Sequence, residues 1–443
     1  MSSTPQQYGS TVLHDSPATA ASVYRKAVWR LMPFLFLALL INGIDRINIS
    51  FAKLRMAEDI ALSDAAYGLG VGAFYLAYLL FEVPSNLYMQ RVGARATLTR
   101  IMVLWGLITM ATALVTTPGQ LIAARFLLGI AEAGFFPGVI LYLTYWFPSA
   151  LRGRITASFM MAAVVAGMIC GPLSGTIMAH LDGWIGLQDW QALFILTGAP
   201  AVVLGVFGWF WLTDRPDQAG WLSDAEKQAI TTDIAAEQKS HGTSERLVDA
   251  FRDPRVYIAG LVYFSIYCGT NTVIYWLPTL IRGLGLDDIK LIGLVSALPF
   301  TAALAGMYLL GLSSDKRHER RWHVAGAMLV SAACFALLGF TQGQLVASLV
   351  VIGIAASAGL SALSLFWTIP PAFLTPTRAV AGIAIISSIG NFAGVVSQGA
   401  VGAIKSATGS LYLAFDMIAM VLVAGALLLL IAIPARILRS ASH

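Results

Sequence analysis

The sequence predicts an all-α membrane protein with 12 transmembrane helices in two pseudo-symmetric six-helix halves. Of its 443 residues, 58% are hydrophobic and only 12% are charged, whereas a soluble protein has about 25% charged residues. Twelve apolar runs are each long enough to cross a bilayer, which takes roughly 20 helical residues. A hydrophilic segment divides these runs into six and six.

Helices are predicted for all these runs, because an open strand would leave backbone groups unpaired in lipid. The predicted spans are 28–50, 66–89, 97–116, 119–147, 154–179, 190–212, 255–282, 290–313, 322–341, 344–373, 379–404 and 410–434. They define an N-terminal tail, a first half, a linker, a second half and a C-terminal tail, at 1–27, 28–212, 213–253, 254–435 and 436–443.

The linker contains one helix-start signal. Ser223 and Glu226 have the spacing of a capping box, in which each side chain bonds the backbone N–H of the other residue. A short helix to about Gln238 is therefore predicted, with a disordered linker as the alternative.

The basic residues indicate topology. With both termini in the cytoplasm, the inner segments hold 21 lysines and arginines and the outer segments hold five. Such an excess marks the cytoplasmic side. The distribution of lysines and arginines therefore predicts that both termini are cytoplasmic and that the chain contacts membrane lipid. It predicts no nucleic-acid partner. Cys170, Cys268 and Cys334 lie in apolar runs without metal-ligand spacing, so we expect no metal. The sequence also lacks a phosphate-binding loop, which argues against direct use of ATP.

Four charged residues lie inside apolar spans. They are Asp45 and Arg46 in the first span, and Arg125 and Glu132 in the fourth. A charge at the bilayer centre is unfavourable by about 3 kcal/mol on insertion scales, so such residues mark function. Arg125 and Glu132 are seven residues apart, on one helix face. All four are predicted near mid-depth, where they could form one cluster.

The chemistry of these side chains suggests a division of roles. Arginine offers a planar fork to a carboxylate, so Arg46 is assigned to an anionic substrate. A buried acid can exchange protons when a neighbouring arginine moves, so Asp45 and Glu132 are assigned to protons and Arg125 to control of Glu132. The alternative is a purely structural pair of salt bridges between the two spans.

Other polar residues have two readings each. Glu82 near the end of the second span is expected to be a gate or structural anchor. Tyr78 and Asn42 either line a cavity or bond neighbouring helices. Trp367, before a proline pair, either stacks on substrate or packs, and Asn391 lies in a polar string of the second half.

Short basic loops recur at matching places in the two halves. One follows the second span at 90–95, and the other, at 311–317, contains Asp315. Internal repeats of this kind are typical of transporters that work by alternating access.

With these residues in place, the chain resembles the major facilitator superfamily over all its spans. More narrowly, it resembles the anion:cation symporter family, which includes bacterial tartrate, phthalate, hydroxyphenylacetate and D-galactonate permeases. The strings that carry the resemblance are NGIDRIN at 42–48, FEVPSN at 81–86, RFLLGIAEAG at 125–134, YLTYWFP at 142–148 and FWTIPP at 366–371.

The resemblance implies a monomeric transporter of the bacterial inner membrane, not an enzyme, that imports an organic anion with protons and needs no other cofactor. It implies that Asp45 and Glu132 match the protonatable pair, Arg46 the substrate arginine and Arg125 the partner of Glu132. It also suggests Tyr78, Trp367 and Asn391 as pocket residues. Gly43 departs from the family, which often has tyrosine there; the glycine is expected to enlarge the pocket or remove a hydroxyl contact.

The leading hypothesis is therefore a proton symporter for a sugar acid or a small hydroxy-dicarboxylate such as tartrate. An aromatic carboxylate is the alternative substrate. A facilitator or exchanger of the same anions, a drug-efflux pump and a membrane receptor are the alternative functions.

Overall fold

The computed structural model describes residues 17–240, 251–317, 319–374 and 376–433. Helices account for nearly all of this part of the chain, and it contains no strand. Eleven of its helices are long and apolar enough to cross a membrane. A twelfth, α3, has 19 residues and carries Arg95 and Arg100 in its first two turns. The predicted all-α membrane fold is therefore confirmed.

The helices of the first group precede the linker. They are α1 (Pro17–Asp59), α2 (Asp64–Val92), α3 (Ala94–Thr112), α4 (Pro118–Glu132), α5 (Phe135–Trp146), α6 (Ser149–His180) and α7 (Asp189–Trp211). The linker contains α8 (Asp224–Ser240). The second group is α9 (Pro254–Gly283), α10 (Ile289–Arg317), α11 (Arg321–Leu337), α12 (Leu345–Phe366), α13 (Pro376–Thr408) and α14 (Tyr412–Ala432).

The fourth span differs from its prediction. A single helix was expected over 119–147, whereas α4 ends at Glu132 and α5 begins at Phe135. Gly134 between them has a φ of +88°, a left-handed conformation that side-chain-bearing residues rarely adopt. The break places Glu132 at a helix end. The tenth span is also shorter than expected, since α12 ends at Phe366, before the proline pair.

The linker helix α8 is held against the first group. Its capping box is formed, with Ser223 N–H donating to Glu226 Oε2 at 2.8 Å and Glu226 N–H donating to Ser223 Oγ at 3.3 Å. Lys26 at the start of α1 pairs with Glu226 at 2.9 Å. Arg152 at the start of α6 pairs with Glu237 at 3.4 Å. The structure thus has a helix at Asp224–Ser240 in the segment between the two groups.

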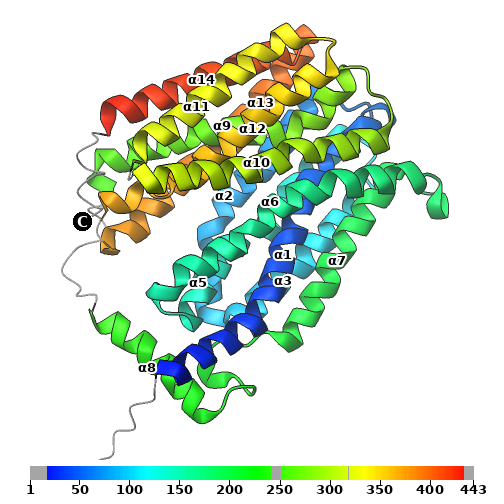
Figure 1. The fold of residues 1–443 in the computed structure, drawn as a ribbon. Coiled ribbons are helices and arrows are strands. Elements are labelled where there is room, and N and C mark those ends of the chain that lie inside the picture. The colour runs from blue at the N-terminus through cyan, green and yellow to red at the C-terminus, as the bar shows by residue number, and fades with distance from the viewer. Residues whose placement is uncertain (1–16, 241–250, 318, 375, 434–443) are drawn as a thin grey trace, which may run out of the picture.

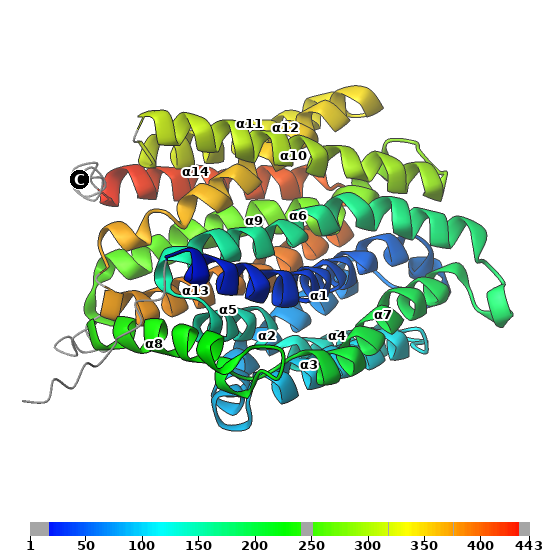
Figure 2. The same ribbon diagram turned by 60° about the horizontal axis from the view of Figure 1, so that its bottom comes forward.

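The two groups of helices lie side by side with α8 at one end, here called the linker end (Figures 1 and 2). At the opposite, far end, where α2 and α10 begin, the groups meet backbone to backbone. A Cβ built on Gly68 of α2 would lie 2.3 Å from the Gln398 carbonyl oxygen of α13, and one on Gly171 of α6 would lie 2.4 Å from the Gly293 oxygen of α10. Toward the linker end, α2 instead exposes Phe81, Val83 and Leu87. The closest contacts between the groups are thus at the far end.

Candidate functional site

A buried carboxylate and an arginine meet between α1 and α4. The Nε of Arg46 donates to Oε2 of Glu132 at 2.8 Å, and Nδ2 of Asn42 donates to the same oxygen at 2.8 Å. Asn42 and Arg46 are one turn apart on α1, so they share a face. The Glu132 side chain is fully buried, whereas that of Arg46 is 22% exposed. The second oxygen, Oε1, is buried and has no hydrogen-bond partner among the described residues.

Local sequence explains why Glu132 reaches this position. One turn earlier, Gly129 lets α4 approach α2 so closely that a Cβ there would lie 2.3 Å from the Phe74 carbonyl oxygen. Two residues later, Gly134 turns the chain. The close helix contact and the helix end together direct the Glu132 carboxylate toward α1.

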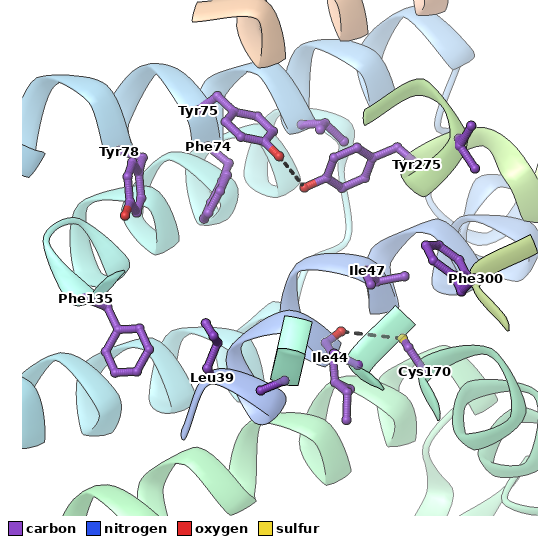
Figure 3. Close-up of a cluster of buried hydrophobic side chains, with 14 of the residues drawn as sticks. Leu39, Ile44, Ile47, Phe74, Tyr75, Tyr78, Phe135, Cys170, Tyr275 and Phe300 are labelled. Atoms are coloured by element: carbon purple, nitrogen blue, oxygen red, sulfur yellow. Dashed lines mark hydrogen bonds between the residues drawn. The ribbon is translucent and has the colours of Figure 1, made fainter. Parts of the chain in front are cut away.

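Aromatic rings of α2 surround the Arg46 guanidinium. Its carbon lies 5.1 Å from the centroid of the Phe74 ring and 4.9 Å from that of Tyr78, which are cation–π distances. Figure 3 shows Phe74 and Tyr78 projecting from α2, while Tyr75 turns toward Tyr275 of α9. The structure therefore brings Tyr78 to Arg46, as expected for a shared pocket.

Asp45 points away from this pair. Its Oδ2 accepts a hydrogen bond from Thr109 of α3 at 2.8 Å, and its Oδ1 accepts one from Asn48 at 3.3 Å. Asn48 also donates to Thr197 of α7 at 2.9 Å. Asp45 is fully buried. Its hydrogen bonds connect α1 to α3 through Thr109 and, by way of Asn48, to α7. Adjacent residues project about 100° apart on a helix, which explains why Asp45 and Arg46 face different neighbours.

Arg125 does not pair with Glu132, contrary to the expected contact. It is 1% exposed, and its Nε and Nη2 have no hydrogen-bond partner among the described residues. Its guanidinium carbon lies 4.9 Å from the Phe74 centroid, so Phe74 touches both arginines. The reason is geometric. Two turns separate the residues by about 10.5 Å along the axis, and helical side chains lean toward the N-terminus, so Arg125 leans away from Glu132.

The second group contributes aromatic and amide side chains. The Tyr75 hydroxyl donates to Oδ1 of Asn271 at 3.0 Å and lies 3.2 Å from the Tyr275 hydroxyl. Trp367 is partly buried, with its ring 4.8 Å from that of Tyr263. Asn391 follows Gly390, against which the Tyr263 ring is tightly packed. The sequence interpretation did not include Phe74, Tyr75, Asn271 or the α9 tyrosines. The aromatic spacing along α2 could have indicated Phe74 and Tyr75.

Glu82 and Asp315 lie at other places. Glu82 is half-buried on α2, one turn beyond Tyr78 toward the linker end. Asp315 is exposed in the last turn of α10 and pairs at 2.5 Å with Arg320, which immediately precedes α11. Their assignment as gate or structural residues stays a prediction. Gly43 packs against α6, since a Cβ there would lie 2.5 Å from the Ala166 Cβ. Its glycine serves helix packing.

The eleven candidate membrane spans of the described residues, with charged side chains buried between them, define a multi-pass membrane protein. The family model described as Major Facilitator Superfamily matches residues 35–398, and the chain belongs to this superfamily. It is 42% identical to the "Putative metabolite transport protein NicT" of Pseudomonas putida, over 98% of this chain and 99% of the relative. It is 41% identical to a "Putative tartrate transporter" of Agrobacterium vitis, over 92% and 94%.

The chain is also similar to a relative that is named for drug resistance and to a solved transporter structure. The "Quinolone resistance transporter" of Acinetobacter baumannii is 37% identical, over 92% of this chain and 94% of the relative. The inward-open structure of the xylose transporter XylE from E. coli superposes with a TM-score of 0.74 at 16% identity, covering 92% of this chain and 96% of that one. At this identity the match shows the fold alone, and it agrees with the helical architecture described above.

Proposed function

We propose that the protein is a proton-coupled symporter that imports an organic anion by alternating access, with the linker end in the cytoplasm. The observation that carries the proposal is the contact of Arg46 with Glu132. A partly exposed guanidinium is bound to a fully buried carboxylate, so a substrate carboxylate and Glu132 would compete for one cation.

Competition for Arg46 provides a coupling mechanism. A proton on Glu132 would remove its negative charge and weaken the contact with Arg46, and the unpartnered Oε1 is the free position for that proton. Arg46 could then bind a substrate carboxylate through its planar fork. Loss of the proton toward the cytoplasm would restore the Glu132 contact and displace the substrate. Asp45, bonded to Thr109, is proposed as a second proton site.

A small hydroxy-carboxylate or sugar acid is the favoured substrate class. The Agrobacterium vitis relative, whose name contains the words tartrate transporter, supports this choice. In addition, Asn271 and the Tyr75 and Tyr275 hydroxyls form a polar set on the second-group side, which suits a substrate with several hydroxyls. Asn391 and Trp367 are assigned to the same pocket.

An aromatic carboxylate is the second candidate substrate, and one observation favours it. Phe74 and Tyr78 lie within 5.1 Å of the Arg46 guanidinium carbon, so an aromatic ring could stack where its carboxylate reaches Arg46. The name of the Acinetobacter baumannii relative makes drug efflux a further candidate. This function fits the site less well for a cationic drug, because Arg46 would repel it.

Uptake into proteoliposomes tests both parts of the proposal. Sugar acids, tartrate and phthalate are offered with and without an inward proton gradient. We expect at least one hydroxy-acid to accumulate only with the gradient. Equal uptake under both conditions would identify a facilitator or exchanger, and preference for phthalate would select the aromatic class.

A further inference from the structure

Two lysines share one carboxylate at the far end of the helix bundle. Lys53 of α1 lies 2.6 Å from Oδ1 of Asp64, the first residue of α2. Lys405 of α13 lies 2.7 Å from Oδ2 of the same residue. The Lys53 side chain is only 5% exposed, and the other two side chains are about one-fifth exposed, at 20% for Lys405 and 23% for Asp64. We call these three residues the far-end triad.

Aromatic side chains complete the surroundings of the triad. The Lys53 ammonium nitrogen lies 3.9 Å from the Trp276 ring centroid of α9 and 4.4 Å from that of Tyr67. Both are cation–π distances, so the two rings add to the contact that Lys53 makes with Asp64. Lys405 lies 6.0 Å from the Trp276 centroid. Among the described residues, Asp64 is thus the ion-pair partner of Lys405 as well as of Lys53.

Two residues of the triad lie in the first group of helices and one lies in the second. Lys53 and Asp64 belong to α1 and α2, which residues 60–63 connect directly. Lys405 belongs to α13 in the second group. Any motion that parts the groups at the far end would keep Lys53 with Asp64 and separate Lys405 from it. Nearby, Arg282 of α9 is 3.6 Å from Glu58 of α1, so the same motion would release a second cation.

We propose that Lys405 is a docking residue for the substrate anion when the far end is open, taking a substrate carboxylate in place of Asp64. The inference rests on the proposed function, because it takes the far end to be the outer, entry side. Arg282 beside it would add to the positive potential at the entrance. Closure would return Lys405 to Asp64 and free the anion to move toward Arg46. The triad would then act in turn as an anion site and as a seal.

The matched variants are Lys405→Met and Asp64→Asn, because both remove the Lys405–Asp64 ion pair but only the first removes the docking cation. Tartrate is the probe, measured by counterflow without a proton gradient. We expect Lys405→Met to raise the apparent KM for entry by roughly fivefold, while the KM for exit stays unchanged. Asp64→Asn should not raise the entry KM, and Lys405→Arg should behave as wild type. Lys290→Met, at an exposed far-end lysine outside the triad, is the control.

A role in sealing alone gives a different result. The KM would then shift in the same direction in Lys405→Met and in Asp64→Asn, and the entry and exit KM values would shift together in each variant. That outcome, or an unchanged entry KM in Lys405→Met, would overturn the docking role. Should Asp64→Asn fail to assemble, ionic strength decides, because salt should raise the entry KM of wild type and not that of Lys405→Met. Net uptake by wild type that does not depend on the proton gradient would contradict the proposed coupling and leave this comparison valid.

Discussion

Replacing Glu132 by glutamine tests the coupling mechanism most directly. The change keeps the size of the side chain but removes the charge that Arg46 contacts at 2.8 Å. A hydrogen bond to a charged group contributes about 1.5–3 kcal/mol. Because the Arg46 side chain is 22% exposed, solvent screening favours the lower end, about 1.5 kcal/mol. Removing this competition should strengthen substrate binding about tenfold at neutral pH.

The same substitution should separate binding from accumulation. A neutral residue at position 132 cannot release the proton that drives uptake, so Glu132→Gln should lose gradient-driven accumulation and keep counterflow exchange. Proteoliposome uptake measures the accumulation, and counterflow in the same proteoliposomes measures the exchange. Asp182→Asn, at an exposed loop carboxylate, is the control. Unimpaired accumulation would refute the reasoning and make Glu132 a structural residue.

Three further outcomes are expected. Arg46→Lys should weaken substrate binding by about tenfold in counterflow, because the planar fork is lost; normal affinity would contradict the assignment. Gly134→Ala places a side chain at a φ of +88°, which costs roughly 1–2 kcal/mol, so its melting temperature should fall below that of Gly119→Ala, where a Cβ meets nothing within 4 Å. The Ser223 N–H and then Lys26 lower the pKa of Glu226, so its contribution should be present at neutral pH. It should begin to fall below about pH 4 and disappear once the pH has passed the lowered pKa, where hydrogen exchange in α8 should become the same in wild type and Glu226→Gln.

The sequence was sufficient to predict features that depend on residues close together in the chain. Apolar runs defined the helices, and the spacing of Ser223 and Glu226 predicted the start of α8. The four buried charges were also found, because a charge inside an apolar run stands out without any structure. The helical fold needed no knowledge of contacts between distant residues.

Partners across helices were harder to predict. Spacing along one helix suggested Arg125 for Glu132, whereas the contact comes from Arg46 on another helix. The break at Gly134 was missed because glycine is common in packed membrane helices, and only the surrounding helices show which one turns the chain. The far-end triad joins residues more than 300 positions apart, a proximity that follows from the packing of α2 on α13.

The backbone seam at the far end has an entropic consequence. Gly68, Gly171 and Gly293 bring main chains into contact with no side chain between them. In the proposed alternating-access cycle this seam would form and separate in every turnover, and ordering a long side chain at each closure would lose up to about 2 kcal/mol of rotamer freedom. Glycine has no rotamers to lose. The seam can therefore close tightly and still reopen with little rearrangement, which makes these three glycines determinants of turnover rate rather than of stability alone.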